Sequence, residues 1–156
     1  MNVLFVCTHN RCRSILAEAI FNHMAPAGIQ GFSAGSAPSG QVHPGSIAQL
    51  RLHGIATDGL YSKSWNELEA VAPDIVITVC DKAAGEACPV FLGRAIKGHW
   101  GMPDPSQVTG TEAEIEAAFE AVYQQFHRRM SQLIEVLQTS PSADQIRATL
   151  KHLETV

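Results

Sequence analysis

The sequence predicts an α/β domain, a three-layer sandwich in which a short, about four-stranded parallel sheet is flanked by helices. Short β-branched and apolar runs alternate along the chain with segments whose apolar residues recur at helical spacing. The run at 75–79, IVITV, is almost wholly apolar, as expected of a strand buried on both faces of a sheet. A chain of 156 residues can bury one substantial core, so we expect a single domain.

Caps, breakers and periodicity predict the individual elements. Pro44 suits the first position of a helix that Gly54 would end, and Thr111 with Glu114 forms a capping box for a long helix. We expect strands at 2–6, 29–34, 75–79 and 95–100, and helices at 13–24, 44–53, 65–72, 111–137 and beyond 141. Leu52 is expected to face inward, and Arg128-Arg129 to lie on a solvated helix face. Residues 1–138 then form the main body of the domain, and residues 139–156 a C-terminal helical extension of the same domain.

Composition narrows the possible functions. The formal net charge is -4 and no basic stripe is present, which argues against a nucleic-acid partner. No apolar segment approaches membrane-spanning length, and the N-terminus has no basic region followed by a long apolar stretch, so we expect a cytoplasmic protein with no membrane partner. Thiols are normally reduced in that compartment. The four cysteines are therefore expected to be reactive or metal-binding rather than structural cross-links.

The sequence CTHNRCRS, residues 7–14, lies between the first strand and the first helix and has the composition of an anion site. Ligands of open α/β sheets bind at the carboxyl ends of strands, where backbone N–H groups and a helix N-terminus favour negative charge. We expect Arg13 to close this ring with a bidentate guanidinium, and Cys7 to be a nucleophilic thiolate with a lowered pKa. Ser14 would donate to that sulfur, and Asn10 would hold the loop's own backbone. The expected oxyanion-binding residues are Thr8, His9, Asn10, Arg11, Cys12, Arg13 and Ser14. The alternative is that the two cysteines are small core residues and the arginine a surface charge.

Three residues far along the chain complete the candidate catalytic set. Cys80 follows the strand at 75–79 and should approach the same edge of the sheet, and Cys88 lies in the loop beyond it. A zinc site at these two cysteines is disfavoured, because their spacing is not C-x2-C and no histidine pair falls at ligand spacing. Asp104, between two prolines, is either an ordinary turn residue or a general acid aimed at a leaving oxygen. We favour the acid because Cys7 supplies a nucleophile.

Residues 7–14 resemble the phosphate-binding loop of the low-molecular-weight protein tyrosine phosphatases and of the arsenate reductases that share their fold. The segment 79–89, with His99-Trp100-Gly101 and Asp104-Pro105, resembles the redox region of the phosphatase-like arsenate reductases. This resemblance implies an arsenate reductase in which Cys7 attacks arsenate and Asp104 protonates the departing oxygen. Cys80 then attacks the adduct and releases arsenite, and Cys88 attacks Cys80. Thioredoxin is the implied donor that reduces the final disulfide, with a glutathione–glutaredoxin route as the alternative.

Two rival functions use the same loop. A low-molecular-weight phosphatase would hydrolyse phosphotyrosine or small phosphoesters, although Ser106 stands where the phosphatases typically carry tyrosine. A non-enzymatic module would bind the oxyanion without reducing it. Phosphate and sulfate should mimic arsenate in all three cases.

The resemblance also bears on cofactors. Asn10, Glu18 and Ser33 match positions that bind potassium in some reductases, but Trp65 or its neighbours replace the expected aspartate. We therefore predict no metal ion and no other cofactor. The chain is expected to act as a monomer.

Overall fold

The computed structural model describes residues 1–86 and 89–156 of the chain. Its sheet has four parallel strands in the order β2-β1-β3-β4. The strands are β1 (Asn2–Val6), β2 (Gln30–Ala34), β3 (Ile75–Thr78) and β4 (Ile96–His99). The inner strands β1 and β3 are nearly free of polar side chains, because both of their faces are covered by the rest of the chain.

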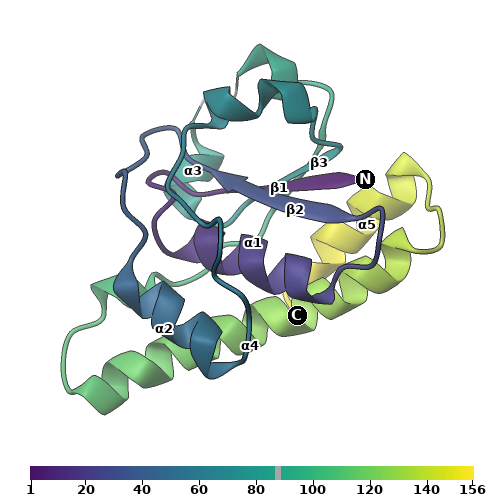
Figure 1. Ribbon diagram of the computed structural model, residues 1–156. Coiled ribbons are helices and arrows are strands. Elements are labelled where there is room, and N and C mark those ends of the chain that lie inside the picture. The colour runs from purple at the N-terminus through teal and green to yellow at the C-terminus, as the bar shows by residue number, and fades with distance from the viewer. Residues whose placement is uncertain (87–88) are drawn as a thin grey trace.

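Helices cover both faces of the sheet, so the predicted three-layer α/β fold is confirmed. The helices α1, α2, α4 and α5 gather on one side, and the shorter η1 and α3 lie toward the other (Figure 1). The α-helices are α1 (Arg13–Met24), α2 (Pro44–Leu52), α3 (Asp81–Ala84), α4 (Glu112–Leu137) and α5 (Ala143–Leu153). The 3-10 segments are η1 (Trp65–Val71), η2 (Val90–Leu92) and η3 (Pro105–Gln107).

The register of the strands positions the site. Val6 pairs with Ala34 on one side and with Thr78 on the other, and Thr78 pairs with His99. All four strands therefore end at one edge of the sheet. The loops that follow them carry the candidate residues to that edge, as expected for a parallel α/β sheet.

Two predictions about side-chain burial are wrong. Leu52 is 75% exposed, because it is the last residue of α2 and points away from the core. Arg129 is only 2% exposed, and burial lowers the pKa of its guanidinium. Its nitrogens donate to the carbonyl oxygens of Val156 and Glu154 and to the sulfur of Met102. The C-terminal residues fold back over α4 to supply these acceptors, which helical periodicity alone cannot reveal.

The C-terminal helix packs on the last strand. Gly98 of β4 has no side chain, and a Cβ there would lie 3.1 Å from Cδ1 of Leu150 on α5. The indole N–H of Trp100, a fully buried residue, donates to the carbonyl oxygen of Leu150 over 3.2 Å. These contacts join α5 to the outer strand of the sheet. Among the described residues, no helix is both long and apolar enough to cross a membrane.

Candidate active site

The loop of residues 7–14, which we call the anion loop, turns its carbonyl groups outward. Three of its carbonyl oxygens accept hydrogen bonds from the backbone N–H groups of residues outside the loop. The pairs are Ala37 to Thr8 (2.9 Å), Ser39 to His9 (3.0 Å) and His43 to Arg11 (2.9 Å). With the carbonyls held outward, the N–H groups of the loop face the opposite way. That arrangement matches an oxyanion cradle at the start of α1.

Asn10 fixes the shape of the anion loop, but not through the loop's own backbone as we predicted. It is fully buried and has a positive φ of 45°, a conformation that asparagine tolerates better than most residues. Its amide donates to the hydroxyl oxygen of Ser14 over 2.8 Å. Its side-chain oxygen accepts from the backbone N–H of Lys63 over 2.9 Å, so it anchors a neighbouring segment. In the part of the chain that the structure describes, Ser14 makes no hydrogen bond to Cys7.

Lys63 was missed by the sequence analysis. It is 5% exposed, and its ammonium lies 3.5 Å from Oε1 of Glu18 and donates to the carbonyl oxygen of Tyr61. Ser33 donates to the same Glu18 oxygen over 2.8 Å. Glu18 and Ser33, which we compared with potassium ligands, are thus paired with a side-chain cation. A lysine in a polar stretch of sequence gives no signal of burial.

Arg13 and Asp104 meet across the mouth of the anion loop. One guanidinium nitrogen of Arg13 donates to the carbonyl oxygen of Met102 over 2.9 Å, and another lies 3.4 Å from Oδ2 of Asp104. Among the described residues, nothing accepts from the buried Nε of Arg13. The other oxygen of Asp104 accepts from the backbone N–H and the hydroxyl of Ser106. Arg13 is therefore held at the loop, and its Nε–H group can still donate to a bound anion.

A cavity of about 50 Å³ lies between these groups. Its lining residues are Cys7, His9, Arg11, Cys12, Arg13, Asp104, Ser106 and Gln107. It can admit a small ion, while drug-sized ligands need several hundred Å³. The nucleophile, the arginine and the candidate acid predicted from sequence thus line one small, largely polar cavity.

A second thiol lies near the predicted nucleophile. Cys80 caps α3, where its sulfur accepts from the backbone N–H of Ala83 over 3.4 Å. Interaction with the Cys7 thiol outweighs burial and lowers the pKa of Cys80 to about 5. The same interaction, with burial, raises the pKa of Cys7, against the lowering effect of Arg13. The pair loses its first proton at acidic pH and holds the second. The prediction that Cys7 has a lowered pKa is wrong, because it treated Cys7 as an isolated thiol and did not include the effect of Cys80.

Glu86 is the second residue that the sequence analysis missed. Its carboxylate accepts a hydrogen bond from the hydroxyl of Thr8 over 2.7 Å and another from the hydroxyl of Ser36. It therefore ties the chain segment after Cys80 to the anion loop and to the loop that follows β2. A glutamate next to small residues resembles any surface residue in the sequence, so no signal could have found it.

Cys12 differs from this pair. Burial raises the pKa of the Cys12 thiol to about 11, so it is poorly suited to act as a nucleophile and is mainly a packing residue of the loop. Cys88, the predicted third thiol, lies outside the described residues.

Comparison with known proteins decides the family. The family model described as low molecular weight phosphotyrosine protein phosphatase matches residues 2–143. The chain belongs to this family. Most of α5 lies beyond the end of the match.

The relatives of this phosphatase-family chain include arsenate reductases. Arsenate reductase 1 of Staphylococcus epidermidis is 34% identical over 123 residues, which is 76% of this chain and 92% of the relative. The thioredoxin-dependent arsenate reductase Cg_ArsC1' of Corynebacterium glutamicum has a similar structure, with a TM-score of 0.68 and 26% identity over 90% of this chain. The chain spans only 63% of that protein's length. A solved arsenate reductase in the phosphate binding state gives a TM-score of 0.65 and 27% identity, with 83% of this chain and 96% of that one covered. The predicted relation to arsenate reductases with a phosphatase-like fold is confirmed.

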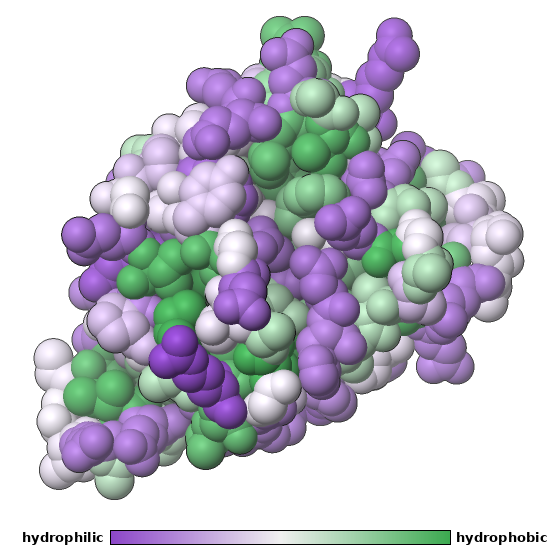
Figure 2. Space-filling view, in the orientation of Figure 1, coloured by the Kyte–Doolittle hydropathy of each residue, from purple (hydrophilic) through white to green (hydrophobic). Residues whose placement is uncertain are grey.

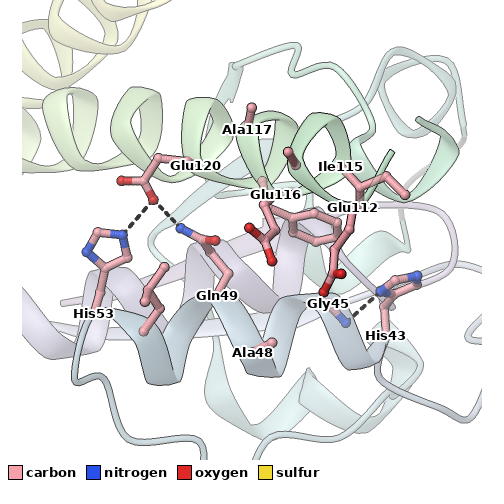
Figure 3. A pocket seen from close by; sticks show the side chains of 13 residues that line it. His43, Gly45, Ala48, Gln49, His53, Glu112, Ile115, Glu116, Ala117 and Glu120 are labelled. Carbon is pink, nitrogen blue, oxygen red and sulfur yellow. Dashed lines mark hydrogen bonds and ion pairs between the residues drawn. The ribbon is translucent and has the colours of Figure 1, made fainter. Parts of the chain in front are cut away.

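This family member has a second, larger hollow away from the anion loop. It has a volume of about 840 Å³ and lies between α2 and the first half of α4. In Figure 3, Glu120 of α4 reaches across to Gln49 of α2 and to His53, the residue that follows α2, and His43 accepts from the N–H of Gly45 at the start of α2. Hydrophobic side chains also reach the surface in this part of the molecule (Figure 2). Nothing in the sequence had indicated this hollow. It shares no lining residue with the small cavity, but the backbone N–H of His43, which lines the larger hollow, donates to the carbonyl oxygen of Arg11, which lines the smaller one.

Proposed function

We propose that this chain reduces arsenate to arsenite through a relay of thiols. The observation that carries the proposal is that Cys80 lies close enough to Cys7 for the two thiols to shift each other's pKa, while Cys7 lines a cavity sized for a small oxyanion. Hydrolysis of a phosphoester needs one nucleophilic cysteine and water. A second thiol placed against that nucleophile suits a reaction in which the substrate accepts two electrons.

The electrons balance in three steps. The Cys7 thiolate attacks arsenic and forms an S–As bond, while Asp104 protonates the departing oxygen so that it leaves as water. The Cys80 thiolate then attacks the sulfur of Cys7. The S–As bond breaks with its electron pair going to arsenic, which leaves as arsenite, and a Cys7–Cys80 disulfide forms. In the last step, Cys88 attacks Cys80, frees the Cys7 thiolate and forms a Cys80–Cys88 disulfide.

The residues around the cavity supply binding and charge. Arg13 and the N–H groups of the anion loop stabilise the oxyanion, and they favour the thiolate that attacks it. Phosphate and sulfate share this tetrahedral geometry and should compete with arsenate. For the electron donor, we favour thioredoxin over glutaredoxin, because the proposed cycle ends in an intramolecular disulfide and the Corynebacterium relative is thioredoxin-dependent.

Cysteine variants test the relay. Cys88→Ser should release one arsenite per chain in a single turnover and stop at the Cys7–Cys80 disulfide, so that steady-state reduction falls by at least ~10³-fold. Cys80→Ser should lose single-turnover release as well. Arsenite is measured directly, and the disulfides are located by mass spectrometry. Unchanged steady-state reduction by Cys88→Ser would overturn the three-thiol cycle.

The same variants separate the rival functions. A phosphatase would hydrolyse p-nitrophenyl phosphate equally well with Cys80→Ser and Cys88→Ser, and would lose that activity only with Cys7→Ser. A binding module would bind arsenate and release no arsenite with any dithiol. Arsenate-dependent oxidation of NADPH, measured once with the thioredoxin system and once with glutathione and glutaredoxin, identifies the donor.

A further inference from the structure

Arg129 of α4 is a buried cation that takes no part in the proposed cycle. It is 2% exposed, and its guanidinium donates to one sulfur and to two backbone oxygens. Among the residues that the structure describes, no aspartate or glutamate side chain forms an ion pair with it. Burying a cation without such a partner is costly, and a well-packed apolar side chain of similar volume is often no less stable. Stability alone therefore does not explain an arginine at this position.

The sulfur that accepts from Arg129 belongs to Met102, whose backbone reaches two parts of the candidate active site. The guanidinium donates to Sδ of Met102 over 3.2 Å. The backbone N–H of Met102 donates over 3.2 Å to the carbonyl oxygen of Val79, the residue before Cys80. The carbonyl oxygen of Met102 accepts from Arg13 over 2.9 Å. Met102 is only 5% exposed and closely packed, so its side chain and its backbone move together.

The candidate acid lies on the same stretch of chain, residues 100–104. Asp104 follows Met102 by two positions, and its Oδ2 lies 3.4 Å from a terminal nitrogen of Arg13. Trp100, at the start of the stretch, is fully buried, and its ring centroid lies 5.9 Å from the guanidinium carbon of Arg129. A guanidinium at that distance from an indole face is attracted to the ring. Arg129 thus contacts two residues of the stretch that ends at the acid.

The remaining contacts of Arg129 are with the C-terminal segment. Nε donates to the backbone oxygen of Val156 over 3.2 Å, and a terminal nitrogen donates to that of Glu154 over 2.9 Å. Both residues follow α5 and lie beyond residue 143, the last one that the family model matches. Because the guanidinium is planar and rigid, its three nitrogens hold these acceptors and Met102 in a fixed arrangement. Contacts therefore run from the C-terminal segment to the small cavity.

We propose that Arg129 is a positioning residue for the oxyanion site and acts through Met102. Its guanidinium ties Met102 to residues 154–156. The carbonyl oxygen of Met102 in turn holds Arg13, which contacts Asp104. Arg13 binds the oxyanion in the ground state and Asp104 acts on the departing oxygen, so loss of Arg129 should weaken binding and also slow the reaction. The effect on rate rests on the proposed function, whereas the effect on anion binding does not.

Phosphate binding by the reduced protein, measured by calorimetry, tests this role without arsenate. Arg129→Met keeps an unbranched side chain in the core but removes every donor, and should raise the phosphate Kd by about tenfold, the equivalent of one hydrogen bond. The matched control is Arg128→Met, the same substitution at the neighbouring exposed arginine, which should leave the Kd unchanged. For arsenate reduction, Arg129→Met should raise KM and lower kcat, with kcat/KM reduced by up to about 10²-fold.

A general loss of stability would give a different result. A partly unfolded variant binds phosphate at fewer sites per chain but with the wild-type Kd, and it lowers kcat without changing KM. A displaced Arg13 instead gives full stoichiometry with a raised Kd. Arg129→Lys keeps the charge and part of the donor set, so it should recover part of the affinity that Arg129→Met loses.

Met102→Leu tests the route through the sulfur. It keeps the volume and the backbone carbonyl but removes the acceptor of Arg129, so it should raise the phosphate Kd in the same direction by a smaller factor. Added to Arg129→Met, it should cause no further loss, because both substitutions break the same contact. If Arg129→Met does not fold, Met102→Leu and Arg129→Lys decide the question by the same measurement.

The proposal is overturned if a folded Arg129→Met or Met102→Leu protein binds phosphate with the wild-type Kd, or if the two effects multiply in the double variant. Failure of this inference is distinguishable from failure of the proposed function. A raised Kd in the variants, with no arsenite released by the wild-type protein, would overturn only the proposed function. Normal arsenite release, with an unchanged Kd in the variants, would overturn only the role of Arg129.

Discussion

Two segments follow neighbouring strands at the same edge of the sheet, and they are held in place very differently. The anion loop after β1 is fixed from several sides by backbone hydrogen bonds from residues 37, 39 and 43 and by the buried side chain of Asn10. Residues 80–86 after β3, which we call the redox segment, contain a helix of only four residues. The side chains that link the redox segment to the anion loop include Glu86, which accepts from the hydroxyl of Thr8 over 2.7 Å, and Cys80, whose sulfur lies 3.8 Å from the same hydroxyl oxygen.

The difference fits what each segment has to do. An oxyanion cradle works best when its donors are already in place before the substrate binds. A relay sulfur must bond first to one cysteine and then to another, and cysteines can bond only when their Cα atoms come within about 7 Å. The firmly held anion loop therefore suits binding of the oxyanion, and the lightly attached redox segment suits electron transfer.

The largest change in stability is expected at the buried ion pair between Lys63 and Glu18. Lys63→Met should lower the free energy of unfolding by about 3–5 kcal/mol, because it leaves the Glu18 carboxylate buried without its cation. Urea unfolding measures this change. The matched control is the double variant Glu18→Gln with Lys63→Met, which removes both charges and should recover most of the loss. Equal losses in the single and double variants would mean that packing, and not the ion pair, holds this region.

Gly35 tests how firmly the anion loop is packed. A Cβ on this residue would lie 2.4 Å from the carbonyl oxygen of Thr8 and 2.7 Å from that of Cys7. Backbone atoms cannot yield as a flexible side chain can, so Gly35→Ala should cost about 1–3 kcal/mol of stability. It should also weaken phosphate binding, measured by calorimetry, because the loop must shift. Phosphate affinity equal to wild type would show that the cradle tolerates displacement.

The contrast between the two segments also explains what the sequence could predict. The anion loop could be predicted, because Cys7, Arg13 and Ser14 stand at a fixed spacing between an apolar strand and a helical pattern. The parallel sheet could also be predicted, from the apolar sequences of its buried strands. The burial or pairing of three charged residues could not be predicted, because it depends on segments distant in sequence; these are Lys63, Glu86 and Arg129. The altered pKa of Cys7 escaped for the same reason, because a neighbour 73 positions along the chain causes it.

The pair of sulfurs predicts a pH dependence. Thiolate should be present in the reduced protein above pH about 5, and alkylation by iodoacetamide should fall away as the pH drops through that value. The thiolate with this midpoint is that of Cys80, and Cys80 raises the pKa of Cys7, so Cys80→Ala should lower the midpoint of alkylation at Cys7. Cys80→Ser also removes the charge of the Cys80 thiolate and leaves a hydroxyl that can donate to Cys7, so it should lower the Cys7 midpoint at least as far. The same midpoint in all three proteins would show that Cys80 does not share a proton with Cys7.

The smallest effect is expected at the glycine of the redox segment. Gly85 has φ of -87° and ψ of -4°, which alanine adopts easily, and among the described residues a Cβ there would meet only the carbonyl oxygen of Lys82, at an ordinary 3.7 Å. Gly85→Ala should therefore stabilise the reduced protein by about 0.4–1 kcal/mol, because it restricts the unfolded chain. If the segment must refold during the relay, the same restriction should slow steady-state turnover while single-turnover release of arsenite stays normal. Turnover as fast as wild type in this stabilised variant would mean that the segment completes the relay without using the freedom of its glycine.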